Sequence, residues 1–390
     1  MPSQEPTRGF AQAEFETRLA KAQGLMAGRE LDAVLLTTEP EIRYFSGFQT
    51  LFWQSPTRPW FLLVPREGEP VAVIPEIGAA LMRQTWINDI RTWSAPAPAD
   101  DGISLLSDLL SPYARSGRTL GLLKGHETSL RMPLGDYERL LAGLPGLRVR
   151  DATDLVRSLR MVKSDAEIEK IAHICAIASR SFGRMDRLIH HGQPLVAAFK
   201  AFKIDCLANG ADDVPYLVGG ADQGGYIDVI SPPSNRPLRD GDIVMMDTGA
   251  VFDGYFCDFD RNYAIGVADD ASKRAYDVAY RATEAGLAAA RPGVTCAQLF
   301  RAMHAVIAEV DAGSGDVGRM GHGLGMQLTE WPSHAAFDDT PLRENMVITL
   351  EPSLSYGDGR IMVHEENIVV RDGPPTLLTR RAPPALPVIG

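Results

Sequence analysis

Two pairs of acidic residues flank two predicted β-turns in the second half of this 390-residue chain. The first pair is Asp247 and Asp258, on either side of an Asp-Gly turn signal. The second pair is Glu351 and Glu365, on either side of a Gly-Asp-Gly segment. Folding each segment as a hairpin sets its two carboxylates across from one another, where like charges destabilise the β-ladder. The pattern therefore indicates that something positive lies between the pairs.

One histidine, His322, lies between the two pairs in the segment GHGLG. Four carboxylates and one imidazole form a mixed O/N ligand set that suits divalent Mn, Zn, Co or Fe. Two such ions would cancel the four negative charges, so the pattern predicts a dinuclear metal site. Each element alone is more often structural, since an Asp-Gly hairpin is usually only a turn and a lone histidine usually belongs to the core. The joint order of all five residues carries the inference.

The contexts MDTG, CDFDR, GHGLG, TLEP and HEEN, in this order, resemble the superfamily of creatinase, prolidase, aminopeptidase P and methionine aminopeptidase. The resemblance covers nearly the whole chain. Residues 159–390 resemble its pita-bread catalytic domain, and residues 1–158 resemble the accessory N-terminal domain of creatinase and prolidase. The resemblance implies an α+β protein: an α/β N-terminal domain, then a pita-bread domain with a pseudo-two-fold antiparallel sheet and helices.

The same resemblance implies a role for each of the five residues. Asp247 would bind one metal ion, and His322 and Glu351 would bind the other. Asp258 and Glu365 would bridge the two ions. Glu351 and His322 would form the catalytic set, with Glu351 as the proton shuttle. The alternative that Glu351 is a ligand only stays open.

Local patterns agree with this organisation. Apolar strands alternate with helical segments in residues 1–158, as in an α/β domain. Ser164 and Glu167 form a predicted capping box that opens a long amphipathic helix at the start of the second domain. The later residues alternate helix pairs with the two acidic hairpins, so each half of the second domain repeats one plan.

Two departures from the peptidase pattern concern histidines around the metal site. Thr329 stands seven residues after the GHG histidine, where the peptidases carry a second histidine. Ile230 and Ser231 stand about seventeen residues before the first aspartate, where the peptidases carry another. The hydroxyls of Thr329 and Ser231 can donate hydrogen bonds but cannot relay protons as imidazoles do. His334, in a segment that follows Trp-Pro-Ser, is a candidate replacement acid–base and substrate-binding group.

These departures bear on the expected reaction. We expect a dinuclear-metal-dependent hydrolase of a small amide-type C–N bond that is Xaa-Pro peptidase-like, with feeble activity on Xaa-Pro dipeptides. One alternative is a metal-dependent lyase or amidine hydrolase of a small metabolite, similar to dimethylsulfoniopropionate lyase or ectoine hydrolase. Another is a non-catalytic binding relative, which the retention of all five ligand positions disfavours.

Substrate residues are also expected in the first domain. Trp53 and Arg58 lie in an aromatic-rich segment together with Tyr44, Phe48 and Trp60. In creatinase-like dimers this domain reaches into the site of the partner subunit. The resemblance therefore implies a homodimer in which Trp53 forms an aromatic wall and Arg58 binds a substrate carboxylate.

Composition narrows the partners and the location. The net charge of −11, without a dense basic run, argues against nucleic acid and leaves a small molecule or short peptide as the substrate. The four cysteines are scattered without CxxC spacing, which disfavours a disulfide framework or zinc finger and fits a reducing cytoplasm. The first residues lack a signal-peptide core and no apolar run reaches transmembrane length, so we expect a cytoplasmic protein without membrane contact.

Overall fold

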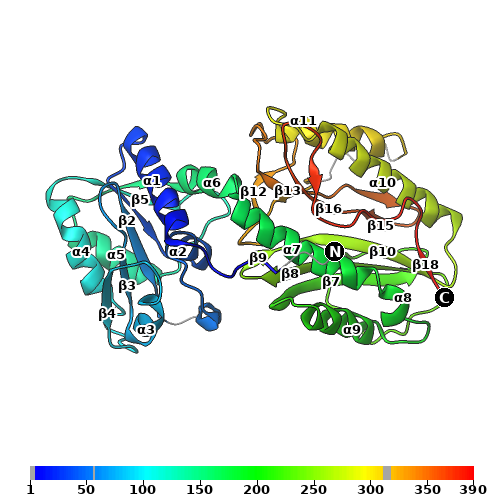
Figure 1. Cartoon of the computed structure of the whole chain (residues 1–390), viewed down its shortest axis with the longest axis horizontal. Coiled ribbons are helices and arrows are strands. Elements are labelled where there is room, and N and C mark those ends of the chain that lie inside the picture. Colours follow the sequence, from blue (N-terminus) through cyan, green and yellow to red (C-terminus); the bar gives the residue numbers. More distant parts are fainter. Residues whose placement is uncertain (1–4, 56–57, 311–317) are drawn as a thin grey trace. The chain divides into compact units, whose positions relative to one another are not determined.

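The structure is a computed structural model that describes residues 5–55, 58–310 and 318–390. It contains two compact units, Thr7–Arg160 and Met161–Gly390, which we call the N-terminal unit and the C-terminal unit. The domain limits expected from the sequence, residues 1–158 and 159–390, remain a prediction. Among the described residues, no helix has the length and apolar character needed to span a membrane. Figure 1 labels the elements of both units.

The N-terminal unit is an α/β layer structure around one mixed sheet of six strands, in the order β4-β3-β2-β1-β5-β6. Antiparallel pairs join β1 to β2 and β2 to β3, and the other neighbours are parallel. Helices cover both faces of the sheet (Figure 1). The elements are α1 (Gln12–Gly28), β1 (Ala33–Leu36), α2 (Glu39–Ser46), η1 (Leu51–Gln54), β2 (Phe61–Pro65), β3 (Val71–Pro75), η2 (Glu76–Gly78), α3 (Ala79–Met82), β4 (Asp89–Trp93), α4 (Ile103–Arg115), β5 (Thr119–Leu122), α5 (Leu134–Gly143), β6 (Arg148–Asp151) and α6 (Thr153–Met161).

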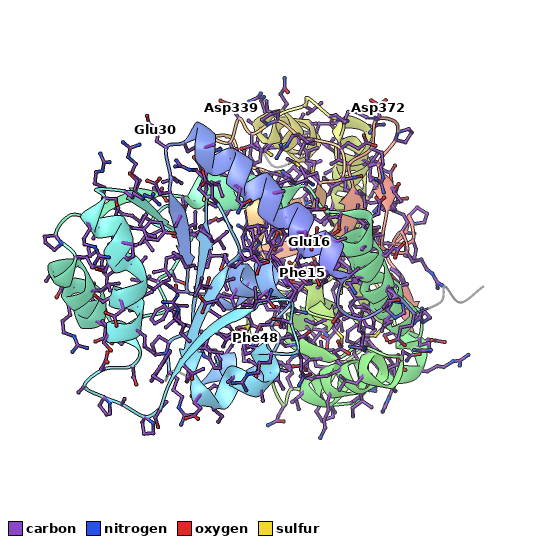
Figure 2. All side chains as sticks on the ribbon, turned by 60° about the vertical axis from the view of Figure 1, so that its left-hand side comes forward. Phe15, Glu16, Glu30, Phe48, Asp339 and Asp372 are labelled. Atoms are coloured by element: carbon purple, nitrogen blue, oxygen red, sulfur yellow. The ribbon has the colours of Figure 1, made fainter. Side chains whose placement is uncertain are left out.

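Amphipathic patterning explains how these helices attach to the sheet. On α1, Phe15 is buried and the next residue, Glu16, is exposed; both are labelled in Figure 2. The opposite face of the sheet packs on α4 and α5 through a cluster that includes Leu106 and Leu140. Sequence periodicity did not predict α4, because Pro112 lies inside it and proline normally ends a helix.

The C-terminal unit has the pita-bread fold, and it is built from two similar halves. In one half, α7 and α9 contact the sheet β18-β10-β8-β7; in the other, α10 lies against β13, β14 and β15 and pairs with α11. The second sheet has the order β12-β11-β13-β16-β17. The elements are α7 (Asp165–Phe182), α8 (Met185–Leu188), α9 (Leu195–Ala208), β7 (Asp213–Gln223), β8 (Asp242–Phe252), β9 (Tyr255–Phe256), β10 (Phe259–Ile265), α10 (Asp270–Ala289), α11 (Cys296–Ile307), β11 (His322–Gly323), β12 (Glu330–Ser333), β13 (Val347–Leu350), β14 (Ser353–Tyr356), β15 (Arg360–Val363), β16 (Glu366–Val369), β17 (Thr376–Leu377) and β18 (Val388–Ile389).

The start of the C-terminal unit confirms a prediction from the sequence. Ser164 caps α7, and its hydroxyl accepts a hydrogen bond from the backbone N–H of Glu167. The Glu167 carboxylate accepts a hydrogen bond from the Ser164 N–H, which completes the capping box. The isoleucines on one side of this helix, among them Ile171 and Ile174, are fully buried. Two units of this kind confirm the predicted α+β architecture.

Candidate metal centre

The first acidic hairpin is formed by β8 and β10, with the short β9 at its tip. Asp253 and Gly254 have φ values of 44° and 68°, which a two-residue hairpin turn of type I′ requires. This tight turn fixes the register so that Asp247 lies across from Asp260. The prediction that Asp247 lies across from Asp258 was therefore wrong. The Asp-Gly signal marks the turn but does not fix the loop length. The two-residue turn places Asp258 diagonal to Asp247.

Strand alternation puts the acidic residues of this hairpin on one face of the sheet. Asp247 and Asp260 are cross-strand neighbours, and Asp258 lies two residues before Asp260, so all three share that face. Tyr216, paired with Gly249 on the neighbouring strand β7, lies on it too. The Tyr216 hydroxyl contacts Asp247. We call this the site face.

The second hairpin supplies two glutamates at the junction of two short ladders. The β13–β16 ladder ends with Leu350 paired to Glu366, and the β14–β15 ladder begins with Ser353 paired to Val363. Both ladders keep the same register, which places Glu351 and Glu365 across from one another between them. The register therefore agrees with the prediction that these two glutamates lie across from one another.

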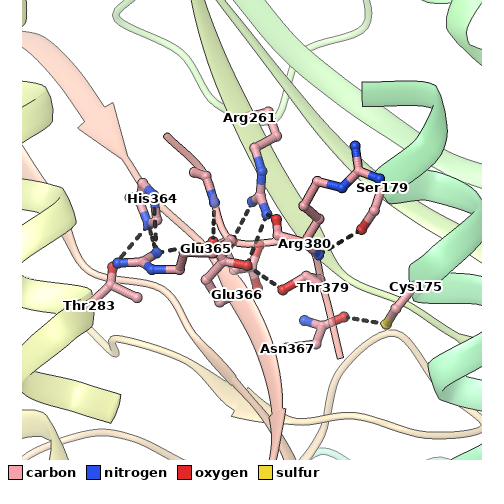
Figure 3. Close-up of polar contacts among 12 residues, drawn as sticks. Cys175, Ser179, Arg261, Thr283, His364, Glu365, Glu366, Asn367, Thr379 and Arg380 are labelled. Atoms are coloured by element: carbon pink, nitrogen blue, oxygen red, sulfur yellow. Dashed lines mark hydrogen bonds and ion pairs between the residues drawn. The ribbon is translucent and has the colours of Figure 1, made fainter. Parts of the chain in front are cut away.

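Asp258 is fixed by the opposite half of the C-terminal unit. Its backbone N–H donates to Asn367 Oδ1 at 3.0 Å, and the Asn367 amide donates to the Asp258 carbonyl. Cys175 Sγ also lies 3.3 Å from Asn367 Oδ1, as Figure 3 shows. One side chain of β16 thereby ties the first hairpin to the second where their carboxylates meet.

His322 lies on β11 between β12 and β13, bracketed by glycines that the crowding requires. A Cβ on Gly321, whose φ is 125°, would lie 2.3 Å from the carbonyl oxygen of Thr349. His322 Nδ1 lies 2.9 Å from the carbonyl oxygen of Gly323, which can only accept, so Nδ1 carries the proton. Nε2 then presents its lone pair 3.4 Å from Asp258 Oδ2 and 4.0 Å from Glu351 Oε2. This tautomer is the one that binds a metal ion through Nε2.

The carboxylates and the imidazole converge on one place. Ligand atoms of Asp258, His322 and Glu365 all lie within 4.8 Å of one another. Asp247, Asp260, Glu351 and Glu365 line one cavity. Its remaining wall is mostly apolar and consists of Tyr216, Val229, Ile230, Met245 and Val363.

The hydrogen bonding of this centre fits metal ions. Within the described part of the chain, one oxygen of each of four site carboxylates is buried and has no hydrogen-bond partner: Asp247 Oδ1, Asp258 Oδ1, Asp260 Oδ1 and Glu365 Oε1. A buried polar atom left without a partner costs about 1–3 kcal/mol, and more when it is charged. Oxygen ligands with one imidazole suit divalent Mn, Zn, Co or Fe. The residues present therefore fit a metal centre.

The pKa values reflect the crowding of like charges. Burial and the neighbouring carboxylates raise the pKa values of Asp258 and Glu365 well above their ordinary range. Burial raises the pKa of Asp247 to about 7, and burial together with the Asp247 charge raises the pKa of Glu351 to about 8. Burial lowers the pKa of His322 to about 4, so its imidazole is neutral at pH 7. Without a cation, burial and the neighbouring charges therefore favour the protonated forms of these carboxyl groups.

Comparison with known proteins agrees with this geometry. Residues 169–372 match metallopeptidase family M24, and residues 18–162 match the creatinase/prolidase N-terminal domain. The chain belongs to metallopeptidase family M24.

Similar proteins within this family are named as dipeptidases. The "Probable dipeptidase PepE" of Mycobacterium tuberculosis is 30% identical over 372 residues, which cover 93% of this chain and 94% of the relative. The Xaa-Pro dipeptidase of Pyrococcus horikoshii is 26% identical over 361 residues, covering 91% and 95%. The crystal structure of dipeptidase PepE from Mycobacterium ulcerans superposes with a TM-score of 0.83 at 28% identity, covering 98% and 99%. This chain is thus a hydrolase, and the metallopeptidase interpretation is favoured over the lyase, amidine hydrolase and binding alternatives.

A network behind the metal centre holds Glu365 in place, and Figure 3 shows much of it. Arg261 Nη1 donates to the Glu365 carbonyl at 2.8 Å, and Arg261 Nη2 lies 2.9 Å from Glu366 Oε2. Arg381 Nη1 lies 3.0 Å from Glu366 Oε1, and the Thr379 hydroxyl donates to Glu366. Burial would raise the pKa of Glu366, but Arg261, His364 and the Thr379 hydrogen bond outweigh it and lower the pKa. We call the face that carries Glu366 the back face.

Two of the predicted substrate residues, Ser231 and Thr329, are not among the described residues that line the cavity. The Ser231 hydroxyl donates to the carboxylate of Asp228, so it serves its own loop. The adjacent Ile230, 73% exposed, lines the cavity instead. Thr329 is half-buried and directly precedes β12, whose first residue Glu330 pairs with Gly323 beside His322. The substrate roles of Ser231 and Thr329 remain predictions.

His334 lies deeper than the sequence indicated. It is fully buried, and its backbone exchanges hydrogen bonds with Gly321 and Met320. Burial lowers the pKa of its imidazole to about 3, with the nearby His322 adding to this effect. His334 therefore lies behind the His322 strand as a neutral ring, and a substrate role for it is a prediction.

Trp53 and Arg58 lie in the N-terminal unit. The Trp53 ring centroid lies 5.7 Å from that of Trp60, and the Arg131 guanidinium lies 5.1 Å from the Trp53 centroid. The Arg58 guanidinium lies 5.2 Å from the Phe52 ring centroid. These contacts form an aromatic and cationic cluster within that unit, and its role toward substrate remains a prediction.

Sequence reasoning missed two residues of the centre and undervalued a third. Tyr216 lies on β7, whose glycine-rich sequence carries no alternating strand pattern. The charge of Arg319 lowers the pKa values of Asp258 and Glu351 against the larger effect of burial, yet no motif marked this residue. The sequence places Asp260 only two residues after Asp258, whereas the hairpin register also places it directly across from Asp247.

Proposed function

We propose that this chain is a dinuclear-metal-dependent peptidase that hydrolyses short peptides, with Xaa-Pro dipeptides as the first substrates to test. Two divalent ions of Mn, Zn, Co or Fe would be held by Asp247, Asp258, His322, Glu351 and Glu365. The observation that carries this proposal is that the buried side chains of Asp258, His322 and Glu365 bring ligand atoms within 4.8 Å of one another. Each of the two carboxylates also has one oxygen without a hydrogen-bond partner among the described residues. The dipeptidase names of relatives that match over nine-tenths of the chain support the substrate class.

The chemistry divides between the ions and the chain. Bound divalent ions supply Lewis-acid polarisation of a carbonyl and lower the pKa of a water. Hydrogen bonds from Asn367 and Arg261 to the backbones of Asp258 and Glu365 fix the positions of these two carboxylates. Pre-positioned groups of this kind need no rearrangement during the reaction.

Glu351 is placed to move a proton. Its side chain retains 32% exposure, whereas the Asp258 side chain retains 5%. Glu351 Oε2 therefore faces both the ligand cluster and the open cavity where a substrate amide would lie. A carboxylate in this place accepts a proton from the attacking water and returns it to the leaving amine. The ligand-only role for Glu351 is tested by the variants described below.

The walls of the cavity favour a small substrate with an apolar side chain. Val229, Ile230, Met245 and Val363 form most of its apolar lining. No imidazole stands at Ile230 or Thr329 to stabilise charge on the tetrahedral intermediate. Losing one such donor typically costs a factor of about 100 to 1000 in rate, so we expect feeble turnover of Xaa-Pro dipeptides.

Assembly and location belong to the same proposal. We infer a homodimer in which Trp53 and Arg58 of one subunit reach the metal centre of the other. We also infer a cytoplasmic location, which the four free, buried cysteines support. Neither nucleic acid nor membrane is an expected partner of a chain with a net charge of −11.

The experiment is a substrate panel with the purified protein, stripped of metal and then loaded with Mn²⁺, Zn²⁺, Co²⁺ or Fe²⁺. The panel contains Xaa-Pro dipeptides, other dipeptides, creatine, ectoine and dimethylsulfoniopropionate. We expect metal-dependent release of free amino acids from at least one dipeptide and no turnover of the three metabolites. Turnover of a metabolite with no dipeptide cleaved would overturn the proposal. Glu351→Gln removes an anionic ligand together with the proton shuttle. If Glu351 shuttles protons, turnover should stay lost even at metal concentrations that restore full loading of the variant, whereas a ligand-only role predicts that turnover returns.

A further inference from the structure

Asp260 is the acidic residue of the site face to which the motif assigns no role. It lies directly across from Asp247 on the β8–β10 ladder and is 2% exposed. It lines the same cavity as Asp247, Glu351 and Glu365. Directly opposed residues of an antiparallel ladder have their Cβ atoms about 4.5–5.5 Å apart. Asp260 is therefore close enough to Asp247 for both carboxylates to bind the same metal ion.

The Asp260 carboxylate is held in one orientation. Asn262 Nδ2 donates to Asp260 Oδ2 at 2.7 Å and to the Val363 carbonyl at 2.7 Å. The Tyr226 hydroxyl donates to Asn262 Oδ1 at 2.8 Å, so the Asn262 amide is fully used. Asp260 Oδ1 is buried and has no hydrogen-bond partner in the residues that the structure describes. The network thus fixes one carboxylate oxygen and leaves the other available to a cation.

The adjacent cation does not neutralise this carboxylate. The Arg261 guanidinium turns to the back face, where it binds Glu366 and the carbonyls of Glu365 and Arg380. Its hydrogen bond to Asp260 goes to the backbone carbonyl, and its charge lowers the pKa of the Asp260 carboxyl against the larger effect of burial. A buried carboxylate needs a partner of opposite charge or several hydrogen bonds. No described side chain on the site face gives Asp260 Oδ1 a cationic partner or a hydrogen bond.

We propose that Asp260 supplies a fifth carboxylate to the metal centre and binds the ion that Asp247 holds. The inference rests on the dinuclear centre of the proposed function. That ion would then have oxygen ligands only, whereas the ion held by His322 and Glu351 would also have an imidazole nitrogen. All-oxygen ligand sets suit hard ions such as Mn²⁺, and imidazole suits Zn²⁺ and Fe²⁺. The two positions are therefore chemically unequal.

A competing role for Asp260 is that of a neutral carboxylic acid that donates a hydrogen bond to Asp247. Asparagine distinguishes the two roles because its amide has the same shape and can donate that hydrogen bond. Asp260→Asn preserves a hydrogen-bonding function but removes the anionic ligand. Asp260→Ala removes both and serves as the second variant.

The test is Mn²⁺ titration of the full-length, chelator-stripped protein by isothermal calorimetry. We expect two sites in the wild type. Asp260→Asn should weaken one site by at least about tenfold and leave the other within about threefold, since even supporting residues change metal affinity by about 10–100-fold. His322→Ala should weaken the other site. Mn²⁺ EPR should show the spin-coupled pair of the wild type replaced by an isolated ion in Asp260→Asn at two equivalents.

The matched control is Asp242→Asn on β8, the strand that pairs with β10. Asp242 is fully buried but lies on the opposite face of β8, where Arg236 Nη1 is 2.6 Å from Asp242 Oδ2. This variant should retain both wild-type Mn²⁺ affinities. Circular dichroism of each chelated variant confirms that it is folded before titration.

Two outcomes separate this inference from the proposed function. If folded Asp260→Asn and Asp260→Ala bind both ions with wild-type affinity, Asp260 is not a ligand, and the peptidase proposal is unaffected. If Asp260→Asn loses one site while the loaded wild type cleaves no dipeptide, the ligand assignment stands and the proposed function falls.

Discussion

Buried carboxylates on the back face of the acidic hairpins pair with arginines, whereas those on the site face have oxygens without hydrogen-bond partners among the described residues. Glu365 and Glu366 are neighbours in the chain and are 1% and 0% exposed. Glu366 has Arg261 and Arg381 as partners, and its pKa is lowered; Glu365 Oε1 has no partner, and its pKa is raised well above the ordinary range. Burial is equal on the two faces, so the partner makes the difference.

This contrast explains how the fold tolerates its acidic centre. On the back face, protein cations compensate the charges, and the pairs lock the strands that carry the ligands. On the site face, no described Lys or Arg side chain donates a hydrogen bond to the unpartnered carboxylate oxygens, so bound metal ions would have to compensate the charge. The same strands thus use buried charge once for structure and once for function.

The largest effect should come from removing a carboxylate that is proposed to bridge two metal ions. We expect Asp258→Ala to lower kcat by more than about 100-fold and to reduce metal content, because both ions lose a ligand. Glu365→Ala should behave alike. Activity assays and elemental analysis of the loaded proteins check this. Full activity and metal content in Asp258→Ala would show that the ligand set is wrong.

The next prediction compares the two faces by stability. Glu366→Ala leaves the buried Arg261 without its carboxylate partner and removes one of the two partners of Arg381. We therefore expect it to destabilise the protein by about 3–5 kcal/mol while retaining two bound ions. Glu365→Gln removes the cost of keeping this buried carboxyl protonated at neutral pH, so it should stabilise the chelated protein by about 1 kcal/mol while losing metal. Urea denaturation with and without chelator measures both. The same sign for both variants in the chelated protein would contradict the contrast between the faces.

A smaller effect should follow from placing an imidazole at Thr329, where the peptidases of the family carry a histidine. We expect Thr329→His to raise any Xaa-Pro hydrolysis by about tenfold or more, since an imidazole there can stabilise the developing charge. Metal content should not change. Steady-state kinetics on an Xaa-Pro dipeptide compares the variant with the wild type. Wild-type turnover at ordinary enzyme rates, with no gain in the variant, would mean that this site stabilises the charge by another route.

The smallest effect is a pH dependence of stability in the chelated protein. The folded pKa values of Asp247 and Glu351, about 7 and about 8, exceed their ordinary values. Below about pH 6.5 the buried imidazoles of His322 and His334, whose pKa values are lowered, act in the opposite sense. From about pH 6.5 to pH 8 the folded state therefore binds more protons than the unfolded state, and stability falls as pH rises. Added metal should stabilise the protein more at high pH, because ions compete with those protons. Thermal melts across this range test both trends, and a flat profile without metal would count against the repulsion.

The sequence predicted the ligand candidates but not their register. Asp-Gly and Gly-Asp-Gly marked both turns, so Asp247, Asp258, Glu351 and Glu365 could be assigned to hairpins. The partner of Asp247 could not be assigned, because one residue of difference in loop length changes every cross-strand pair. That difference is what brings Asp260 into the centre.

Residues without a motif could not be placed from the sequence either. Tyr216 reaches Asp247 from β7, and Arg319 acts on the centre from a segment without secondary structure; only the tertiary fold joins them to the ligands. His334 follows Trp-Pro-Ser and carries no burial signal in the sequence, but it is fully buried because its segment pairs with the strand that carries His322. Long-range pairing decides such positions, and local pattern does not.

The most direct test of the central claim is the metal stoichiometry of the wild type. The full-length protein should be stripped by chelator, reloaded with Mn²⁺, freed of excess ions and analysed for metal and protein together. Compensation of the site-face charge by bound ions predicts about two ions per chain, with a higher melting temperature than the stripped protein. A folded protein that binds no divalent ion, and melts at the same temperature with and without Mn²⁺, would contradict it.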